Sequence, residues 1–411
     1  MAPNALIRPM GLTEALCAEW YVAIPFGLQV VGAVALDRPL SLERLQDAAE
    51  RVKARHPLLS SGIERINGDW WFTESESTSA DVRLAPSGSS WRDRFAAAQS
   101  TLVDLRSSPW FVELVSEPTD ATESSVVMVV GCHAIFDGIA LAQVLRELVD
   151  DSADTSRESP LPAMEDFLPA RAIHLAPPTM TVTDQWQVEQ QSPATDRSFG
   201  FLDRFLDATT VDALHKRTKE EHTTIASALA VACCRARHTL TNHGEVVGFN
   251  IPFDARRHTN PPLPNNTVGA YFGRAHVYGN GTTSDNDPWS EARRLDVALR
   301  AEIEHASRPA RWDSRDVAAQ VAELCRDNRE SFDLDVLLTD LGTVELGPDA
   351  RGLWFTTVQT TGLEAFVVSA ATCNGVLGLG VGWPQPLVSD VTALAFTDAL
   401  VQEVQSLATP N

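Results

Sequence analysis

The sequence lacks an apolar run that could cross a membrane, for which about 18–20 residues are needed. It is also poor in basic residues: 33 Lys and Arg stand against 55 Asp and Glu in 411 residues, giving a formal net charge of -22. Because nucleic acids and anionic membrane surfaces bind clustered Lys and Arg, this balance argues against both as partners. We therefore expect no membrane insertion and no nucleic-acid partner.

Cysteine is scarce too. The six cysteines are scattered without a Cys-x-x-Cys motif, which is typical of a reducing compartment rather than of a disulfide framework. The first residues do not resemble a signal peptide, since no long apolar stretch follows a basic start. We therefore expect a cytoplasmic protein. Its histidines lack the Cys or carboxylate spacing typical of zinc sites, so no metal site is expected.

The chain has an ordinary globular composition, with 44% hydrophobic and 21% charged residues. Residues 150–198 change character: they are rich in proline, serine, threonine and acids and show little periodicity, as in a linker between domains. We therefore divide the chain into an N-terminal domain (1–175), a crossover linker (176–198) and a C-terminal domain (199–411). Two domains of this size bury enough surface alone that we expect a monomer.

Strand and helix patterns alternate in both halves. The β-branched run at 124–132 predicts a strand that is buried on both faces. Residues 41–55 predict an amphipathic helix with Ser41 as its N-cap. The second half combines helical segments with strand-like runs at 335–338 and 366–370. These patterns indicate mixed sheets with flanking helices.

One segment carries the candidate chemistry. The strand at 124–132 delivers His133 to its end, and Asp137-Gly138 then leads into an amphipathic helix. Strand ends in such sheets present side chains to clefts, and an imidazole with a pKa of about 6.5 suits proton transfer near neutral pH. The alternative is a core histidine beside an N-cap aspartate, which explains most isolated His-x-x-x-Asp pairs. An isolated pair lacks the order found here, in which a strand, the histidine, Asp-Gly and a helix follow one another, and this order favours a functional histidine.

The segment VVMVVGCHAIFDGIALAQVLREL resembles the His-x-x-x-Asp-Gly signature of the acyl-CoA-dependent acyltransferase superfamily. That superfamily includes nonribosomal peptide condensation domains, plant BAHD enzymes and microbial alcohol acyltransferases. Residues 36–59, 249–273 and 339–342 are similar to further stretches of the family in the expected order. The resemblance implies an α/β (α+β) fold of two chloramphenicol-acetyltransferase-like domains, each a mixed sheet with flanking helices, that enclose a tunnel.

The resemblance also implies roles for individual residues. His133 would be the general base that takes a proton from an acceptor hydroxyl or amine as that atom attacks a thioester. Asp137 would be structural and paired with an arginine, for which Arg256 or Arg257 is the expected partner. The residues expected to support the site are Asp137, Gly138, Arg256 and Trp383. The residues expected to contact donor or acceptor are Arg257, Tyr271, Thr339, Lys216 and Arg217, although the last two also fit a solvated helix face.

Two departures from the family pattern limit the resemblance. Cys132 stands where many condensation domains carry a first histidine. Residues 380–384 keep the glycine and tryptophan of the plant members' Asp-Phe-Gly-Trp-Gly motif but lack its aspartate and last glycine. We therefore expect a microbial or condensation-like relative rather than a plant-type one.

The implied activity is transfer of an acyl group to a hydroxyl or amine of a small hydrophobic acceptor. The donor substrate would be acyl-CoA or acyl-phosphopantetheine on a carrier protein, and no bound cofactor is expected. The net charge disfavours an acidic carrier, because like charges slow encounter. Two alternatives stay open: the same scaffold could guide a cyclisation or dehydration of a biosynthetic intermediate, or the protein could be a catalytically silent binding partner.

Overall fold

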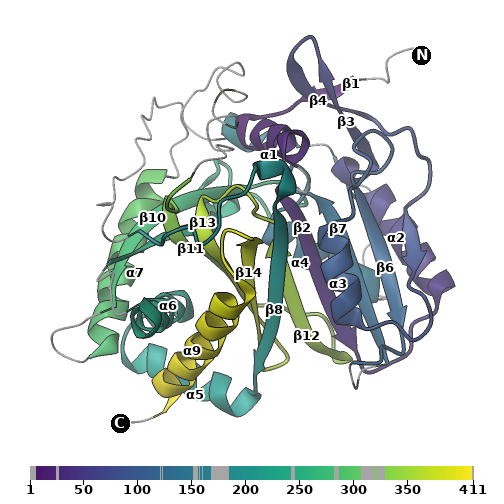
Figure 1. Ribbon diagram of the computed structural model, residues 1–411. Coiled ribbons are helices and arrows are strands. Elements are labelled where there is room, and N and C mark those ends of the chain that lie inside the picture. Colours follow the sequence, from purple (N-terminus) through teal and green to yellow (C-terminus); the bar gives the residue numbers. More distant parts are fainter. Residues whose placement is uncertain are drawn as a thin grey trace.

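The computed structural model describes residues 6–24, 27–120, 122, 124–150, 156, 158–159, 161–167, 185–241, 246–281, 287–306, 319, 321 and 329–409. Two large sheets lie side by side, one built mainly from each half of the chain, and helices cover their outer faces (Figure 1). This arrangement confirms the predicted fold class of mixed sheets with flanking helices.

The first sheet has the strand order β12-β2-β7-β6-β5. β2 (Gln29–Leu36), β7 (Ser125–Cys132) and β6 (Trp110–Ser116) are antiparallel neighbours, and the short β5 (Val82–Leu84) runs parallel to β6. Every residue of β2 and β7 is buried. The apolar run predicted as a doubly covered strand is therefore the centre of this sheet.

Helices and a small sheet complete the first half. The helices are α1 (Leu12–Ala23), α2 (Leu42–Arg55), α3 (Trp91–Gln99) and α4 (Gly138–Val149). The predicted cap of α2 is confirmed, since the Ser41 hydroxyl accepts a hydrogen bond from the Arg44 amide. The small sheet, in the order β1-β4-β3, lies beside α1 at one end of the molecule (Figure 1). Its strands are β1 (Leu6–Pro9), β3 (Ser61–Ile66) and β4 (Asp69–Glu74).

The second sheet has the order β10-β9-β11-β13-β14-β8. Its strands are β8 (Ser198–Leu206), β9 (Val246–Asp254), β10 (Phe272–Asn280), β11 (Leu334–Thr343), β13 (Glu364–Cys373) and β14 (Val376–Gln385). β11 is parallel to both of its neighbours, and the other pairs are antiparallel.

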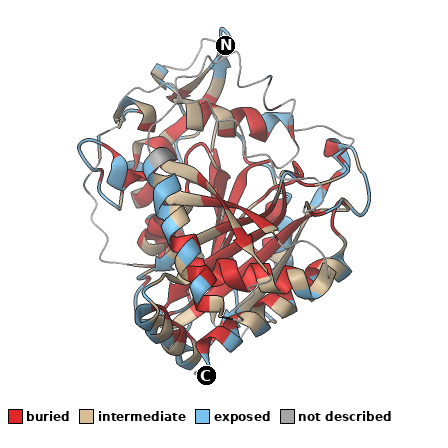
Figure 2. Cartoon of the chain, turned by 90° about the vertical axis from the view of Figure 1, so that its left-hand side faces the viewer, coloured by how far each residue is buried: buried red, intermediate tan, exposed pale blue. Residues whose placement is uncertain are grey.

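Helices cover one face of the second sheet. They are α5 (Ala208–Glu220), α6 (Ile225–Thr241), α7 (Pro288–Ala306) and α9 (Asp390–Ala408). On the side seen in Figure 2 the helices carry the exposed residues of this face, although parts of them are buried like much of the sheet behind them. Short 3-10 turns occur at η1 (Pro57–Ser60), η2 (Met164–Phe167), η3 (Ala194–Asp196) and η4 (Ala255–His258).

One strand of the second half belongs to the first sheet. β12 (Ala350–Thr357) pairs antiparallel with β2 along its whole length, and it also packs against β13 and β14. The boundary expected at residue 199 therefore does not separate the two sheets completely. Of the crossover linker predicted at 176–198, residues 176–184 lie outside the described residues.

The contact between β12 and the second sheet requires a glycine. A Cβ atom on Gly378 of β14 would collide with the backbone carbonyl oxygen of Leu353 in β12. Because that neighbour is backbone, it cannot move aside as a flexible side chain would. We therefore expect Gly378→Ala to lower the free energy of unfolding by about 1–3 kcal/mol, measured by urea denaturation. The control is Glu345→Ala on the exposed loop before β12, and equal stability of both variants would contradict the tight contact.

Candidate active site

His133 lies where the two large sheets face each other. It directly follows β7, and its backbone amide donates a hydrogen bond to the Leu28 carbonyl (3.1 Å) just before β2. Its ring lies against the ring of Phe272 on β10, with 4.7 Å between the ring centroids. The first sheet thus presents the imidazole directly to the second.

The imidazole lines a cavity of about 50 Å3, called here the histidine cavity. Both sheets contribute to its wall, which is formed by Leu28, Val30, His133, Asp137, Gly138, Pro252, Phe272, Arg274, Leu337, Thr339, Phe355, Thr357 and Gln359. A larger neighbouring hollow of about 220 Å3 reaches α6 and α7. The two spaces share five wall residues, namely Asp137, Gly138, Pro252, Phe272 and Thr339.

Burial decides the protonation state of His133. The loss of hydration lowers its pKa to about 4, although backbone carbonyl groups and the Asp137 carboxylate oppose this shift. The ring is therefore neutral at pH 7. Its Nδ1 atom is buried and meets no hydrogen-bond partner in the described part of the chain. The His133 ring lines the histidine cavity, and no hydrogen bond of its side chain to another described residue occupies it.

Asp137 fixes the loop that carries His133. Its Oδ1 accepts a hydrogen bond from the Ala140 amide (2.7 Å) and so caps α4, as the sequence predicts. Its Oδ2 accepts another from the Tyr271 amide (2.8 Å) in the second half of the chain. The same oxygen lies 2.8 Å from Nη1 of Arg256. One carboxylate therefore holds a helix of the first half and two residues of the second.

Arg256 is the predicted partner of Asp137, and the ion pair confirms that choice. Its side chain is completely buried and also contacts Asp254 (3.0 Å) and the Thr267 carbonyl (2.8 Å). Burial opposes its charge, but the two aspartates outweigh this and raise its pKa. Arg257 is not the partner, because its side chain is 74% exposed and reaches only Asp254, at 3.8 Å.

Three further predicted residues line the site. Gly138, Tyr271 and Thr339 all border the neighbouring hollow, and Gly138 and Thr339 also border the histidine cavity. A Cβ atom on Gly138 would come within 2.6 Å of Cδ2 of Leu341, so the turn after Asp137 leaves no room for a side chain. The Tyr271 hydroxyl donates to the Pro162 carbonyl at 3.0 Å.

Four predicted residues lie elsewhere, and one of them is Arg257, which lines neither space. Trp383 is buried in the core of the second half, where its Nε1 donates to Asp390 (3.1 Å), and it lines neither space. Its strand lies toward the β8 edge of the sheet, away from β9 and β10. Lys216 and Arg217 lie on α5 and pair with acids one turn later on the same helix. The solvated-face interpretation fits Lys216, whose side chain is 77% exposed, whereas Arg217 is 21% exposed and lies over the Trp289 ring.

Sequence reasoning missed three polar residues of the histidine cavity, namely Arg274, Thr357 and Gln359. Arg274 lies on β10, where no strand was predicted because the run 272–280 mixes polar and apolar residues. The pattern that could have identified β10 is the alternation of its side chains between two faces. Ala275 and Val277 are buried, while Phe272 and Arg274 line the cavity. Gln359 follows β12, the strand that changes sheets, so no local pattern marks it.

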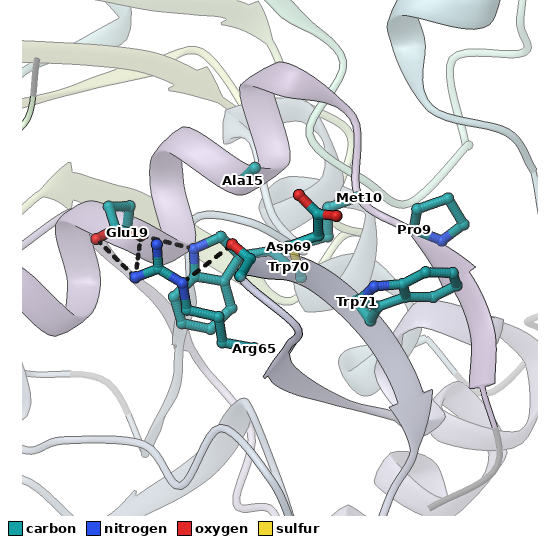
Figure 3. A pocket seen from close by; sticks show the side chains of 9 residues that line it. Pro9, Met10, Ala15, Glu19, Arg65, Asp69, Trp70 and Trp71 are labelled. Carbon is teal, nitrogen blue, oxygen red and sulfur yellow. Dashed lines mark hydrogen bonds and ion pairs between the residues drawn. The ribbon is translucent and has the colours of Figure 1, made fainter. Parts of the chain in front are cut away.

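Another hollow, of about 220 Å3, lies between α1 and the small sheet (Figure 3). Two of its charged groups, Arg65 and Glu19, are matched to each other. Arg65 pairs with Glu19 at 3.2 Å, and the Trp70 indole also donates to Glu19, at 2.8 Å. It holds no histidine and lies apart from His133, so it is not the candidate site.

The described residues contain neither a metal site nor a membrane-spanning helix. No group of His, Cys, Asp and Glu side chains among them is arranged to hold a metal ion. None of their helices combines the length and the apolar character of a membrane span.

Solved structures of other proteins are similar in fold to this chain. Polyketide synthase associated protein 5 from Mycobacterium tuberculosis is similar over 99% of both chains, with a TM-score of 0.70 and 15% sequence identity. The condensation domain of the Monacolin K polyketide synthase MokA covers 98% of both chains, with a TM-score of 0.71 and 11% identity. The chain has the fold of a condensation domain.

A third similar structure is the TRI3 trichothecene 15-O-acetyltransferase from Fusarium sporotrichioides. It covers 98% of this chain and 94% of its own, with a TM-score of 0.69 and 13% identity. No family model and no curated protein sequence matches this chain. The fold that the sequence resemblance implies is thus confirmed.

The buried ion pair generates a stability prediction. In Arg256→Met the Asp137 carboxylate would stay buried without its cation, so we expect the free energy of unfolding to fall by about 3–5 kcal/mol. The matched control is Arg257→Met, because the exposed neighbour should change stability by less than about 0.5 kcal/mol. Urea denaturation of both variants measures the difference. Equal stability of the two variants would show that Asp137 does not depend on Arg256.

Proposed function

We propose that this protein is an acyltransferase that moves an acyl group from a thioester to a hydroxyl or amine of a small acceptor, with His133 as general base. The observation that carries the proposal is a neutral imidazole that lines a cavity between two sheets. The donor thioester would be acyl-CoA or acyl-phosphopantetheine. The similar structures support this, since one is named as an acetyltransferase and two as parts or associates of polyketide synthases.

The chemistry follows from the state of the imidazole. The acceptor oxygen or nitrogen attacks the thioester carbonyl carbon while the imidazole of His133 takes its proton. When the tetrahedral intermediate collapses, the carbon–sulfur bond breaks and the imidazolium returns the proton to the leaving thiolate. Because burial disfavours the charged ring, the proton moves only as charge develops on the attacking atom. Thr339, Thr357 and Gln359 line the cavity and are the candidate hydrogen-bond donors to the oxyanion.

Substrate panels test the proposal. We would offer acyl-CoAs of increasing length together with a library of small alcohols and amines, and detect products by mass spectrometry. His133→Ala should lower kcat/KM by about 10²–10⁴-fold, the usual contribution of a general base. The control is His222→Asn, which replaces a histidine at the turn between α5 and α6. A His133→Ala protein that folds and keeps nearly full activity would refute the base assignment.

An omitted-donor reaction separates acyl transfer from cyclisation or dehydration on the same scaffold. If the protein transfers acyl groups, omission of the thioester should abolish every product. A product formed from an intermediate without any acyl donor would refute the proposed reaction while leaving His133 as an acid or base.

The lowered pKa of His133 predicts an unusual pH dependence. A general base works only when deprotonated, so activity is lost as the pH falls through the pKa of the ring. Since that pKa is about 4, kcat/KM should stay level between pH 8 and pH 5.5 and decline only below that range. An ordinary histidine would produce a decline near pH 6.5. The profile is measured with circular dichroism at each pH as a check on folding, and a midpoint between 6 and 7 would contradict the burial argument.

A further inference from the structure

Arg274 brings a second functional group into the histidine cavity. It lies two residues after Phe272 on β10, so both side chains lie on the same face of the strand, and Phe272 contacts the His133 ring. Its cross-strand neighbour, Pro252 of β9, lines the same cavity. Arg274 is therefore part of the wall of the cavity that holds His133.

Within the described part of the chain, Arg274 forms no ion pair or hydrogen bond. Its side chain lies near two aromatic rings. The guanidinium carbon is 5.6 Å from the ring centroid of Trp20 and 5.9 Å from the ring centroid of Phe272. Arg256 offers the contrast, since two aspartates and backbone carbonyls surround it. Arg274 is partly buried, and no carboxylate of the described residues forms an ion pair with it.

The acids around the cavity do not supply the missing charge. Asp137 lines the cavity but is already engaged by Arg256 and by two backbone amides. Glu364 on β13 is buried, and burial raises its pKa, although the charge of Arg274 acts in the opposite direction. One of its oxygens accepts from Asn250, and no ion pair joins it to Arg274. The cation is thus left to a ligand.

The rest of the wall would strengthen such a contact. Leu28, Val30, Leu337 and Phe355 make much of the cavity apolar, and opposite charges attract more strongly in such surroundings than in water. A guanidinium presents N–H groups in a planar fork that matches the two oxygens of a carboxylate. Because Arg274 and His133 line the same cavity of about 50 Å3, one small molecule could contact both side chains.

We propose that Arg274 binds a carboxylate of the substrate and so selects substrates that carry one close to the reacting centre. This inference rests on the proposed function, because it names the chemical class of molecule that reaches His133. The carboxylate can belong to the acceptor, as in a hydroxy acid or amino acid. It can equally belong to the acyl group, as in a dicarboxylic half-thioester, and the test separates the two sources.

The experiment compares matched pairs of substrates. The acceptor arm uses hydroxy acids and amino acids of two to eight carbons, each beside its methyl ester. The donor arm uses malonyl-, succinyl- and glutaryl-CoA beside acetyl- and butyryl-CoA. For at least one pair, in one arm, the wild-type protein should prefer the carboxylate by at least about tenfold in kcat/KM, the usual strength of a charge-assisted hydrogen bond. A wild-type protein that prefers no carboxylate in either arm would overturn the proposal.

Variants of Arg274 assign the preference to this residue. Arg274→Met should abolish it, whereas Arg274→Lys, which keeps the charge, should retain part of it. Should the methionine variant fail to fold, Arg274→Gln serves the same purpose. A preference that survives the loss of the charge would refute the assignment. So would an equal loss of kcat with charged and uncharged substrates, because that pattern fits a role in stabilising the oxyanion or tuning His133.

A binding measurement distinguishes failure of this inference from failure of the proposed function. Calorimetric titration with each acid and each ester alone, without a reaction partner, reports on the subsite whether or not turnover occurs. Tighter binding of an acid, lost in Arg274→Met, would support the subsite even if no acyl transfer were found. Turnover of uncharged substrates with no preference for carboxylates would sustain the acyltransferase and refute the subsite.

Discussion

The ion pair between Asp137 and Arg256 is the constraint on which the rest of the site depends. Its two members come from different halves of the chain, 119 residues apart, and both are buried. A buried carboxylate without its cation would be strongly unfavourable, so the loop after β7 is stable only when the second half is docked against it. The same carboxylate caps α4 and holds the Tyr271 amide. The position of His133, four residues earlier, is therefore set by the contact between the halves.

Two arginines close to one histidine have opposite relations to their surroundings. Arg256 is fully satisfied by protein groups and is inaccessible, which suits a structural role. Arg274 has aromatic neighbours but no counter-ion among the described residues, which suits recognition. Residue type alone would not distinguish them, because both are arginines close to the antiparallel pair of β9 and β10. The distinction comes from the carboxylates that tertiary structure places beside each one.

The sequence predicted those parts of the site that local chemistry determines. His133 ends an apolar strand, Asp137 caps the helix that follows, and both features can be recognised within fifteen residues. The family resemblance offers two arginines, Arg256 and Arg257, as partners of Asp137, and the structure shows that the buried one forms the ion pair.

The sequence does not predict which strands pair over long distances. β12 joins the first sheet although more than 200 residues separate it from its other strands, and the polar residues of β10 face a cavity that exists only after the halves meet. Trp383 was misplaced because a glycine-tryptophan pattern does not specify which edge of a sheet it occupies.

The net charge of -22 and an unmatched arginine in the site act over different distances. Exposed charges are screened beyond about 8 Å at physiological ionic strength, so the acidic surface mainly affects the approach of large anionic partners. Inside the cavity the imidazole is neutral and the Asp137 carboxylate is paired with Arg256, which leaves Arg274 without an ion pair among the described residues. A small carboxylate would therefore be slowed little on approach and held strongly on arrival, whereas an acidic carrier protein would meet the repulsion of the whole surface. The same charge distribution thus favours a small anionic substrate and opposes a large anionic partner.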